Sequence, residues 1–449
     1  MTSKPLEGTV RHSARRRFFS LGDRRSLSGD YDVVIVGGGT AGCCLARRLS
    51  DDATRRVLLI EAGPADRARD IHIPPGFVNL FGGPLDWAFR TEPELHLGGR
   101  RLAWPRGRVL GGSSSINAQL YVRGHRRDYD RWAELGAKGW SWDDVLPYFR
   151  RSEDQQRGAS PLHGSGGPLR VEDRRYVNPL TETFLAACGE LGWTPNDDFN
   201  GARQEGYGLY QVTQRRGARA SSATSFLRPI AGRSNLDILL DHVVDRIDIA
   251  GSRARALELR GPAGTQRLEL AGELVLAAGA IGSPHLLLRS GVGAATALRE
   301  VGVEPRVDLP GVGENLQDHP VVSVIFRSRR DLGLDHVETL GNLARYLLAR
   351  RGPFTTTVCE AGAFLRTRTG LEQPDLQFHF LPAALVEHGA RSAADHGFNF
   401  GPTLLKPASR GRLRLHSTDL GAPPRLEPGY LSAPEDLEVL LEGIATARR

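Results

Sequence analysis

The chain has 449 residues, which is enough for about two or three domains of ordinary size. Hydrophobic residues make up 40% of it and charged residues 25%, as in a globular protein with a sizeable core, and no apolar run reaches the ~18–20 residues that span a membrane. The net charge is +7, but residues 1–30 hold seven basic against three acidic residues, so the remainder carries no basic stripe that would indicate nucleic-acid binding.

Residues 1–30 are predicted to form a basic, flexible tail. Within them, RRRFFS from Arg15 to Ser20 is similar to a twin-arginine export signal. Such a signal continues into an apolar segment, whereas the charged sequence LGDRRSLSGD follows here. We therefore interpret this region as a tail and not as an export signal.

A βαβ unit is predicted from Tyr31, where the pattern changes abruptly to YDVVIVGGGTAGCCLARRLS. Val33–Val36 is a short apolar strand, Ala41–Leu49 opens a helix, and a second apolar strand lies within Arg55–Gly63. This order predicts a parallel sheet with a right-handed crossover. The adjacent Cys43–Cys44 pair is interpreted as packing residues. Because none of the four cysteines forms a C-x-x-C pair, we expect reduced thiols, no metal site and a cytoplasmic protein.

The turn of this unit has the spacing of a phosphate cradle. Gly37, Gly39 and Gly42 form a G-x-G-x-x-G pattern, which permits a tight turn, a close approach of backbone to a pyrophosphate, and close packing of helix on strand. The helix N-terminus would then present its N–H groups to the phosphates. Glu61 follows 19 residues after Gly42, where an acid that bonds ribose hydroxyls is expected. These residues predict an adenine dinucleotide and leave FAD and NAD both open.

Helical patterning resumes within Tyr129–Ser152, and Asn235–Ile249 and Arg267–Ala280 are rich in β-forming residues. After His319, three stretches are predicted to be strands of a second, mostly antiparallel sheet: Val321–Ser328, Cys359–Thr367 and Pro374–Pro382. The predicted fold class is therefore α/β (α+β overall), with a Rossmann-like dinucleotide domain and a second domain built on an antiparallel sheet.

Two longer motifs are rich in glycine and serine. GRVLGGSSSINAQLYVRG (Gly107–Gly124) has paired glycines that let backbone approach a flat or charged ligand, and polar side chains that offer donors and acceptors. GAIGSPHLLLRSGVG (Gly279–Gly293) follows a strand, and Ser283 is predicted to cap a short helix that has Pro284 at its first position and ends at Ser290-Gly291. By themselves the two motifs are also compatible with a polar loop and an ordinary strand–turn–helix.

With these motifs the sequence is identified as a member of the glucose–methanol–choline (GMC) oxidoreductases, FAD-dependent enzymes that oxidise alcohols. Both motifs resemble family signatures, and Pro310–Pro320 and Ser409–Asp419 resemble further family segments in the expected order. The resemblance covers the chain from Tyr31 onward. It implies FAD as the cofactor, a small-molecule alcohol (choline-like substrates included) as the hydride donor, and flavin N5 as the acceptor. It identifies neither the alcohol nor the electron acceptor.

The resemblance also implies which residues hold FAD. Gly37, Gly39 and Gly42 would lie at the pyrophosphate and Glu61 at the adenosine ribose. The other implied cofactor-binding residues are Val109, Asn117, Ala118, Gln119 and Leu120 at the flavin, Gly111 and Gly112 where backbone approaches the cofactor, and Val244 at the adenine end. Ile116 stands where some members attach FAD through a histidine, so non-covalent FAD is expected.

No catalytic residue is assigned within the chain. In the family, the proton-accepting histidine lies in a C-terminal segment that also closes the FAD domain, and the sequence stops at Arg449 before such a segment. The last stretch, SAPEDLEVLLEGIATARR, is predicted to be a helix capped by Ser432 and Glu435. Its apolar face, formed by Leu437, Leu440, Leu441 and Ile444, is predicted to pack on the substrate side. We therefore expect an incomplete chain that holds FAD weakly and oxidises no alcohol by itself. A non-catalytic flavin-binding fragment or interaction protein is the alternative.

Other titratable residues stay open. His319 is expected to be structural, and His379, His388 and His396 are expected to be packed or solvated histidines, not catalytic bases. Glu360, in CEAGAF, either places a carboxylate above the flavin, which would suit a cationic alcohol, or is a surface acid on an edge strand. The predicted organisation is a tail at 1–30, a FAD-binding portion at 31–320 that includes substrate-domain insertions, and a truncated substrate-binding portion at 321–449.

Overall fold

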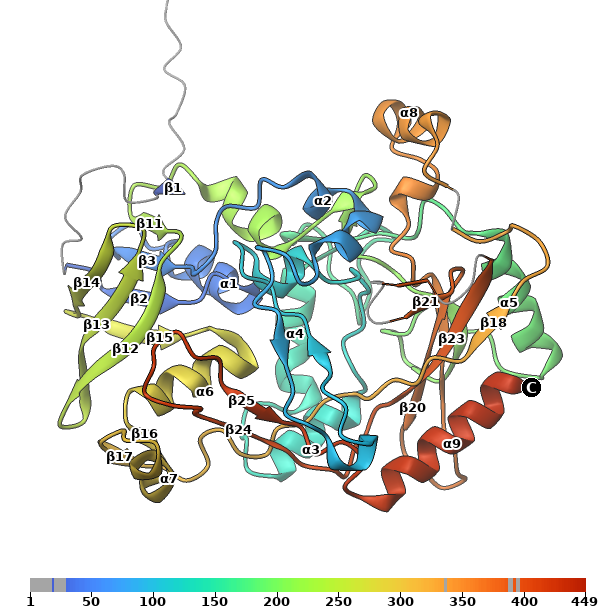
Figure 1. Cartoon of the computed structure of the whole chain (residues 1–449). Coiled ribbons are helices and arrows are strands. Elements are labelled where there is room, and N and C mark those ends of the chain that lie inside the picture. Colours follow the sequence, from blue (N-terminus) through green and yellow to red (C-terminus); the bar gives the residue numbers. More distant parts are fainter. Residues whose placement is uncertain (1–17, 20–29, 335–336, 387–390, 393–395) are drawn as a thin grey trace, which may run out of the picture.

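The structure is a computed structural model that describes residues 18–19, 30–334, 337–386, 391–392 and 396–449. Two five-stranded sheets form its two ends, a mostly buried parallel sheet on the left of Figure 1 and an antiparallel sheet on the right. Helices and irregular segments lie between and around them (Figure 1). The predicted α/β class, with a Rossmann-like part and a second antiparallel sheet, is confirmed.

The parallel sheet explains the apolar runs near the N-terminus. All its neighbouring strands are parallel. In spatial order they are β1 (Phe18–Phe19), β11 (Leu236–Leu239), β3 (Val57–Ile60), β2 (Val33–Val36) and β15 (Glu273–Leu276). Every residue of β2 and β3 is buried, because both faces of the sheet are covered, so VVIV and VLLI are continuous apolar runs instead of alternating ones.

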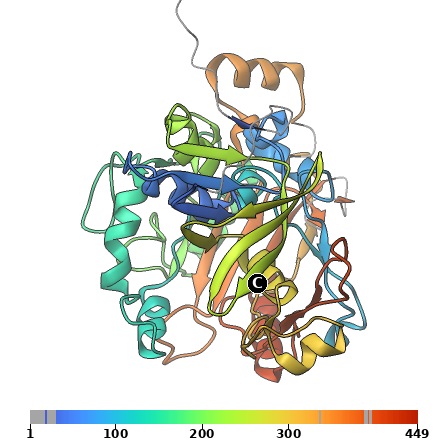
Figure 2. The ribbon, with the colours of Figure 1, turned by 90° about the vertical axis from the view of Figure 1, so that its left-hand side faces the viewer.

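Each face of this sheet packs against a different layer. On one face, Ile35 of β2 joins Cys43 of α1 (Thr40–Leu49) in a buried cluster, so Cys43 is a packing residue as predicted. On the other face, Val34 joins Leu257 in a cluster with a small antiparallel sheet. The strands of that sheet are β12 (Val243–Ala250), β13 (Arg253–Gly261) and β14 (Gly264–Glu269). Figure 2 shows these long strands in front of the parallel sheet.

Two residues of the predicted flexible tail take part in the fold. Phe18 and Phe19 form β1, which pairs in parallel with Ile238 and Leu239 of β11. The prediction of a flexible tail is wrong for these two residues, because their backbone groups satisfy the open edge of the sheet. The rest of the predicted tail lies outside the described residues.

The second sheet is antiparallel throughout. In spatial order its strands are β18 (Ile325–Arg327), β23 (Gly397–Leu404), β20 (Leu376–Leu381), β19 (Ala361–Leu365) and β8 (Gly206–Leu209). Its core is aromatic: Phe184 of helix α5 (Pro179–Glu190) stacks on Phe380 with ring centroids 4.5 Å apart. Because β8 comes from a much earlier part of the chain, the sheet takes strands from both sides of the predicted boundary at residue 320.

Helix α9 (Pro434–Arg448) covers the same face of this sheet, but not as the sequence predicted. The cap residue is Ala433 and no side chain caps the helix, so the predicted capping by Ser432 and Glu435 is wrong. Asp436 instead accepts hydrogen bonds from the backbone N–H groups of Ala408 (2.7 Å) and Ser409 (2.9 Å), which ties the helix start to a neighbouring loop.

The buried face of α9 also differs from the predicted one. Leu440 is 2% exposed, whereas Leu437 and Leu441 are 45% and 55% exposed. The helix approaches β23 through Gly443, where an added Cβ would lie 2.6 Å from the Pro402 Cβ. Close backbone approach, which the apolar spacing cannot show, therefore sets the orientation of this helix.

Short elements complete the fold, and two helices, α3 (Arg126–Glu134) and α4 (Trp142–Ser152), lie where helical patterning is predicted near Tyr129–Ser152. The remaining helices are α2 (Arg69–His72), α6 (Gly279–Arg289), α7 (Ala295–Glu300) and α8 (Leu340–Ala349). The short helical turns are η1 (Pro74–Leu80), η2 (Leu95–Leu97), η3 (Gly112–Ser115), η4 (Ala223–Leu227), η5 (Arg228–Ile230) and η6 (Pro353–Thr355). None of the helices in the described ranges is long and apolar enough to cross a membrane.

Pairs of short strands connect segments of the loops as two-stranded sheets. They are β4 (Phe89–Arg90) with β5 (Ala103–Trp104), β6 (Glu153–Gln155) with β7 (Leu169–Val171), β9 (Gln214–Arg215) with β10 (Ala218–Arg219), β16 (Val292–Gly293) with β17 (Val307–Asp308), β21 (Leu385–Val386) with β22 (Arg391–Ser392), and β24 (Arg412–Arg414) with β25 (Arg425–Glu427).

Candidate cofactor site

A cavity of about 1710 Å³ opens at the carboxyl ends of the parallel strands. Val36 at the end of β2, Glu61 just after β3 and Leu276 at the end of β15 all line it. In open α/β sheets, ligands bind at this edge because the loops that follow the strands converge there. The cavity therefore lies at the predicted phosphate cradle, the Gly37–Gly42 turn that follows β2.

The glycine turn forms one wall of the cavity. Gly37 has a φ of +104°, and an added Cβ would lie 2.6 Å from the Ala277 carbonyl oxygen. At Gly42 an added Cβ would lie 1.9 Å from the Gly37 carbonyl oxygen, so the helix packs directly on the turn. Gly39 differs, since a Cβ there would meet nothing nearer than the Gly112 Cα at 3.9 Å. Gly39 thus leaves free space at the N-terminus of α1, which no side chain caps.

Glu61 is almost completely buried, with 5% of its surface exposed. Its Oε2 accepts a hydrogen bond from the Gly38 N–H and its Oε1 one from the Gly63 N–H, each 2.8 Å long. Burial raises the pKa of this carboxyl to about 7 despite these two donors. Each carboxylate oxygen has a second lone pair, so Glu61 can accept further hydrogen bonds from hydroxyls in the cavity.

The second glycine loop meets the first at the cavity. Gly112 has a φ of +55°, and an added Cβ would lie 2.7 Å from the Gly39 Cα. Gly112 lines the cavity, whereas Gly111 lies behind the lining. A Cβ added to Gly111 would lie only 2.3 Å from the Ser115 hydroxyl. Val109 is fully buried in a cluster with Ile116 and does not line the cavity.

Asn117 to Leu120 leave the cavity and run toward the second sheet. Asn117 Oδ1 accepts a hydrogen bond of 2.8 Å from Arg219 Nη1. Ala118 packs on a cluster that contains Val358, and Leu120 on a cluster that contains Tyr210 of the substrate-side region. Gln119 adopts a left-handed φ of +60°, which is uncommon outside glycine. The structure thus brings this segment between the two sheets.

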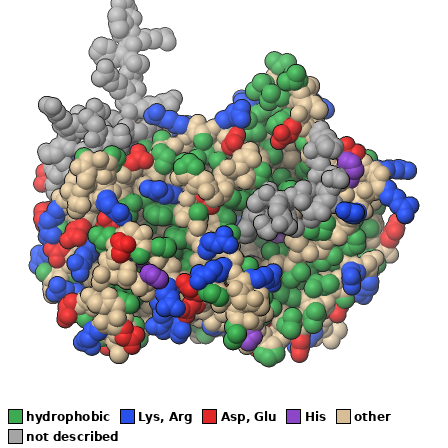
Figure 3. All heavy atoms as spheres, viewed as in Figure 1, with side chains coloured by type: hydrophobic (Ala, Val, Ile, Leu, Met, Phe, Trp, Pro, Cys, Tyr) green, Lys and Arg blue, Asp and Glu red, His purple; other side chains and the backbone are tan. Residues whose placement is uncertain are grey.

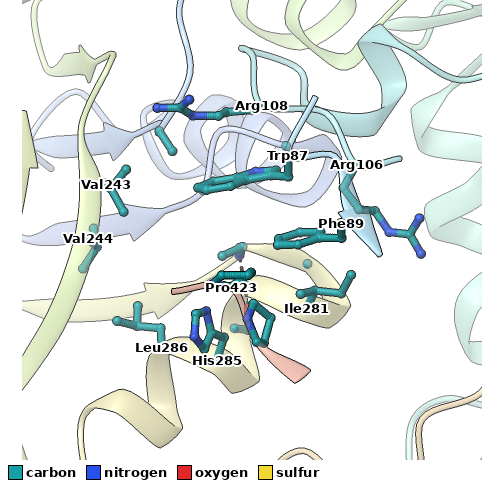
Figure 4. A pocket seen from close by; sticks show the side chains of 18 of the residues that line it. Trp87, Phe89, Arg106, Arg108, Val243, Val244, Ile281, His285, Leu286 and Pro423 are labelled. Atoms are coloured by element: carbon teal, nitrogen blue, oxygen red, sulfur yellow. Dashed lines mark hydrogen bonds between the residues drawn. The ribbon is translucent and has the colours of Figure 1, made fainter. Parts of the chain in front are cut away.

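The far end of the cavity is apolar on one side. Val243 and Val244 of β12 line it together with Leu286 of α6 (Figure 4). Val244 therefore lines the same cavity as Gly37, Gly39, Glu61 and Gly112. Behind this lining lie Gly42, Val109 and Gly111. Outside the cavity lie Asn117, Ala118, Gln119 and Leu120.

Several lining residues were not predicted from the sequence. Trp87 and Phe89 stack with ring centroids 5.8 Å apart and face His285 and Pro423 across the cavity (Figure 4). The Arg108 guanidinium lies 5.3 Å from the Trp87 ring centroid. Burial lowers the pKa of His285 to about 4, so this histidine is neutral near pH 7. Trp87 and Phe89 come from a segment without hydrophobic periodicity, so no sequence pattern indicated them, and Arg108 belongs to the Gly107–Gly124 motif but was given no role there.

Helix α6 forms another wall, and it begins earlier than predicted. Gly279, with a φ of +78°, turns the chain directly from β15 into the helix, and Pro284 lies inside it. Ser283 is therefore not the cap, although its hydroxyl accepts a hydrogen bond of 3.1 Å from the Ala278 N–H. The predicted end is confirmed, since Ser290 is the C-cap residue and Gly291 follows it with a φ of +81°.

Comparison with known proteins decides what this arrangement is. A family model described as GMC oxidoreductase matches residues 31–321. The chain is 42% identical to an alcohol dehydrogenase [acceptor] of Pseudomonas putida, over 93% of this chain and 77% of that protein. It is 38% identical to the mitochondrial choline dehydrogenase of Homo sapiens, over 96% of this chain and 76% of that protein. The chain belongs to the GMC oxidoreductase family.

Solved structures agree. The fold matches pyridoxine 4-oxidase from Mesorbium loti with a TM-score of 0.85 and 33% identity, covering 93% of this chain and 80% of that one. It also matches formate oxidase of Aspergillus oryzae RIB40, studied for modification of its FAD, with a TM-score of 0.85 and 26% identity, covering 94% and 81%. FAD is the cofactor of this GMC chain, as predicted. The open space at Gly39 and the buried acceptor Glu61 fit its pyrophosphate and ribose.

Glu360 of this GMC chain was expected either to place a carboxylate above the flavin or to be a surface acid, and it does neither. Glu360 is completely buried. Its Oε1 accepts a hydrogen bond of 2.6 Å from the Thr356 hydroxyl, and its Oε2 accepts bonds from the Asn178 N–H (2.8 Å) and the Thr181 hydroxyl (2.7 Å). Glu360 therefore anchors the N-terminus of α5 and is not a surface acid, and its oxygens are occupied by donors of the protein.

The histidines on the substrate side are also engaged. His379 Nδ1 lies 3.0 Å from the Thr403 hydroxyl, and its ring stacks on Tyr210 at 5.8 Å. Burial lowers the pKa of His379 to about 4 and also lowers the pKa of His319. His396 lies 3.5 Å from an Asp331 oxygen. His388 lies outside the described residues. We name no catalytic residue among them.

Proposed function

We propose that this GMC oxidoreductase binds FAD non-covalently and oxidises the CH–OH group of a small alcohol. The observation that supports this most is the convergence of Gly39, Glu61 and Gly112 on one cavity at the carboxyl edge of the sheet. When bound, FAD supplies the acceptor for the hydride of the carbinol carbon. The named relatives include an alcohol dehydrogenase and a choline dehydrogenase, so an alcohol is the substrate class in common.

In this proposal each wall of the cavity holds one part of the cofactor. The Gly37–Gly39 turn and the N-terminus of α1 bind the pyrophosphate through backbone N–H groups and the helix dipole. Glu61 accepts hydrogen bonds from the ribose hydroxyls, and Val244 contacts the adenine. Ile116 has a hydrocarbon side chain that is 2% exposed, so it offers no nucleophile for a covalent bond.

The experiment is reconstitution of the purified chain with FAD. After acid precipitation, the flavin should appear in the supernatant, since no covalent bond retains it. The reconstituted chain is then assayed with primary alcohols, choline among them, and a redox dye. Flavin that stays with the precipitate would contradict non-covalent binding.

The alternative is a flavin-binding protein that turns over no alcohol. One observation favours it: both carboxylate oxygens of Glu360 accept hydrogen bonds from protein donors, which leaves no substrate-side carboxylate assigned. Both functions predict FAD binding. Alcohol-dependent reduction of the dye supports the oxidoreductase and contradicts the expectation that this chain oxidises no alcohol by itself. Bound FAD without any such reduction supports that expectation and the alternative.

The four cysteines are free: Cys43, Cys188 and Cys359 are buried and Cys44 is partly buried. Free thiols support the predicted cytoplasmic location, because disulfides are rare there. Cell fractionation with an antibody to the chain tests it, and recovery in an extracellular or periplasmic fraction would contradict it.

A further inference from the structure

Helix α8 stands away from the body of the molecule. It protrudes at the upper right of Figure 1, and Figure 3 shows hydrophobic side chains gathered on the same protrusion. Its attachment is narrow and lies on η6. Tyr346 is the buried residue of the helix, with 1% exposed, and its ring lies 6.1 Å from the Phe354 ring.

The apolar face of α8 points to solvent. Leu340, Leu347 and Leu348 are 86%, 60% and 89% exposed, and Ala344 is exposed as well. These positions have the spacing i, i+4, i+7 and i+8, which places them on one face of the helix. In a globular protein such a face normally packs on the core, whereas here the helix is attached through the opposite side at Tyr346.

Arginines surround the base of this apolar tip. Arg345, Arg350 and Arg351 are exposed and follow one another along the helix and its end, and Glu338 before the helix is the one acid of this segment within the described residues. Arg216 lies close by, since a Cβ on the next residue, Gly217, would lie 3.1 Å from the Arg350 carbonyl oxygen. Among the described residues none of the four arginines forms an ion pair with a carboxylate, and the Arg350 guanidinium lies over the Tyr346 ring, 4.6 Å from its centroid.

We propose that α8 is an interfacial anchor that inserts its three leucines into an anionic lipid surface while the arginines at its base contact the headgroups. An exposed apolar face with a cationic border is the pattern of helices that lie in the membrane interface. Anionic leaflets attract such arginines from within about a Debye length. At ten residues the helix is too short to span a bilayer, so it would lie in the interface.

A second copy of the chain is a less suitable occupant. In a twofold dimer formed through this tip, each α8 would face its own equivalent. The arginines of the two copies would then meet with only Glu338 of each segment to balance them, which opposes association. Lipid headgroups supply the missing negative charge.

The experiment measures binding of the purified FAD-loaded chain to vesicles of phosphatidylcholine, with and without phosphatidylglycerol, by sedimentation. We expect binding to the anionic vesicles that weakens as salt is raised. The double variant Leu347→Ser/Leu348→Ser should bind about tenfold or more weakly. The matched control is Leu437→Ser/Leu441→Ser on α9, which removes two exposed leucines elsewhere and should bind like the parent chain.

A label tests the orientation. Leu348→Cys carrying an environment-sensitive dye should show a blue shift with anionic vesicles, and Leu441→Cys with the same dye should not. Equal sedimentation of the Leu347→Ser/Leu348→Ser variant and the parent chain would overturn the proposal, as would no sedimentation at all. A dimer in solution that this variant loses, without vesicle binding, would show that the occupant is a second copy.

Discussion

Gly39 and Gly112 pack against each other, although their two loops are far apart in the sequence. The contact leaves no space for a side chain on Gly112. A Cβ added to Gly112 would lie 2.7 Å from the Gly39 Cα, whereas a Cβ added to Gly39 would project into the open cavity. The two glycines are therefore needed for different reasons. Gly112 permits the loops to meet, and Gly39 leaves room for the cofactor.

The first prediction uses this difference. Gly39 has a φ of −76°, which alanine can adopt, so Gly39→Ala should fold normally. Its methyl group fills space assigned to the pyrophosphate, and we expect FAD affinity to fall by about tenfold, or about 1.4 kcal/mol. Titration of the cofactor-free chain with FAD, followed by flavin fluorescence, measures this. Gly232→Ala is the control, since a Cβ there meets nothing within 4 Å. Equal FAD affinity in Gly39→Ala and the parent chain would show that the pyrophosphate lies elsewhere.

The second prediction concerns the buried carboxyl of Glu61. Its pKa is raised from 4.5 to about 7 in the folded, cofactor-free chain, so the folded state holds a proton that the unfolded state releases. The free energy of unfolding should therefore decrease as pH rises from about 4.5 to about 7, by about 3 kcal/mol from this group. Urea unfolding of the cofactor-free chain at pH 5 and pH 8 measures it.

Glu61→Gln cannot titrate, so the difference in stability between this variant and the parent chain should change over the same pH range. It should also bind FAD more weakly, because an amide presents one acceptor oxygen in place of two. A difference in stability that is the same at pH 5 and pH 8 would contradict the raised pKa.

A third prediction follows from the anchoring role of Glu360. Removing its carboxylate in Glu360→Ala leaves the Asn178 N–H and the Thr181 and Thr356 hydroxyls without their acceptor. We expect a loss of about 3 kcal/mol in the free energy of unfolding, with a smaller loss in Glu360→Gln. Urea unfolding measures both. Glu372→Gln, at an ion pair whose carboxylate is 70% exposed, is the control and should change stability by less than about 1 kcal/mol. If Glu360→Ala unfolds like the control, the anchoring role is wrong.

The fourth prediction concerns a buried histidine. His163 Nε2 lies 2.9 Å from Asp198 Oδ2, and its Nδ1 lies 3.0 Å from Glu153 Oε1. Hydrogen bonds to Asp198 and Glu153 raise the pKa of His163 from 6.5 to about 9. Its contribution to stability is therefore complete below about pH 6.5 and is lost as pH rises through about 9.

Urea unfolding at pH 6 and pH 9.5 checks this prediction. His163→Gln should destabilise the chain clearly more at pH 6 than at pH 9.5, because only the protonated histidine donates from both ring nitrogens. His96→Gln, at an exposed position, serves as the control and should show no such difference. An effect of His163→Gln that does not depend on pH would mean that the histidine is neutral in the fold.

The local elements of the cofactor site could be predicted from the sequence. Val33–Val36 is a continuous apolar run of strand length, and the glycines after it stand at the spacing of a tight turn into a helix, so β2, the turn and α1 follow from residues that are neighbours in the chain. Gly37, Gly39, Glu61 and Val244 line one cavity, and their contacts with FAD stay a prediction.

Contacts between distant residues could not be predicted. The expected cap of α9 does not form, and Asp436 in its first turn accepts hydrogen bonds from the backbone of Ala408 and Ser409, nearly thirty residues earlier. The role of Glu360 depended on Asn178 and Thr181 of α5, which lie about 180 residues away. No spacing within the motif CEAGAF contains that information.

By itself, the sequence determined the class of the protein: the apolar strands, the glycine turn and the signature motifs, each encoded within a few consecutive residues. The tertiary structure decided which side chains line the cavity and which face of α8 stays exposed. It also decided that Glu360 accepts hydrogen bonds from protein donors at the start of α5. The physical reason is that burial and hydrogen-bond satisfaction are properties of neighbours in space, and most of those neighbours are distant in the chain.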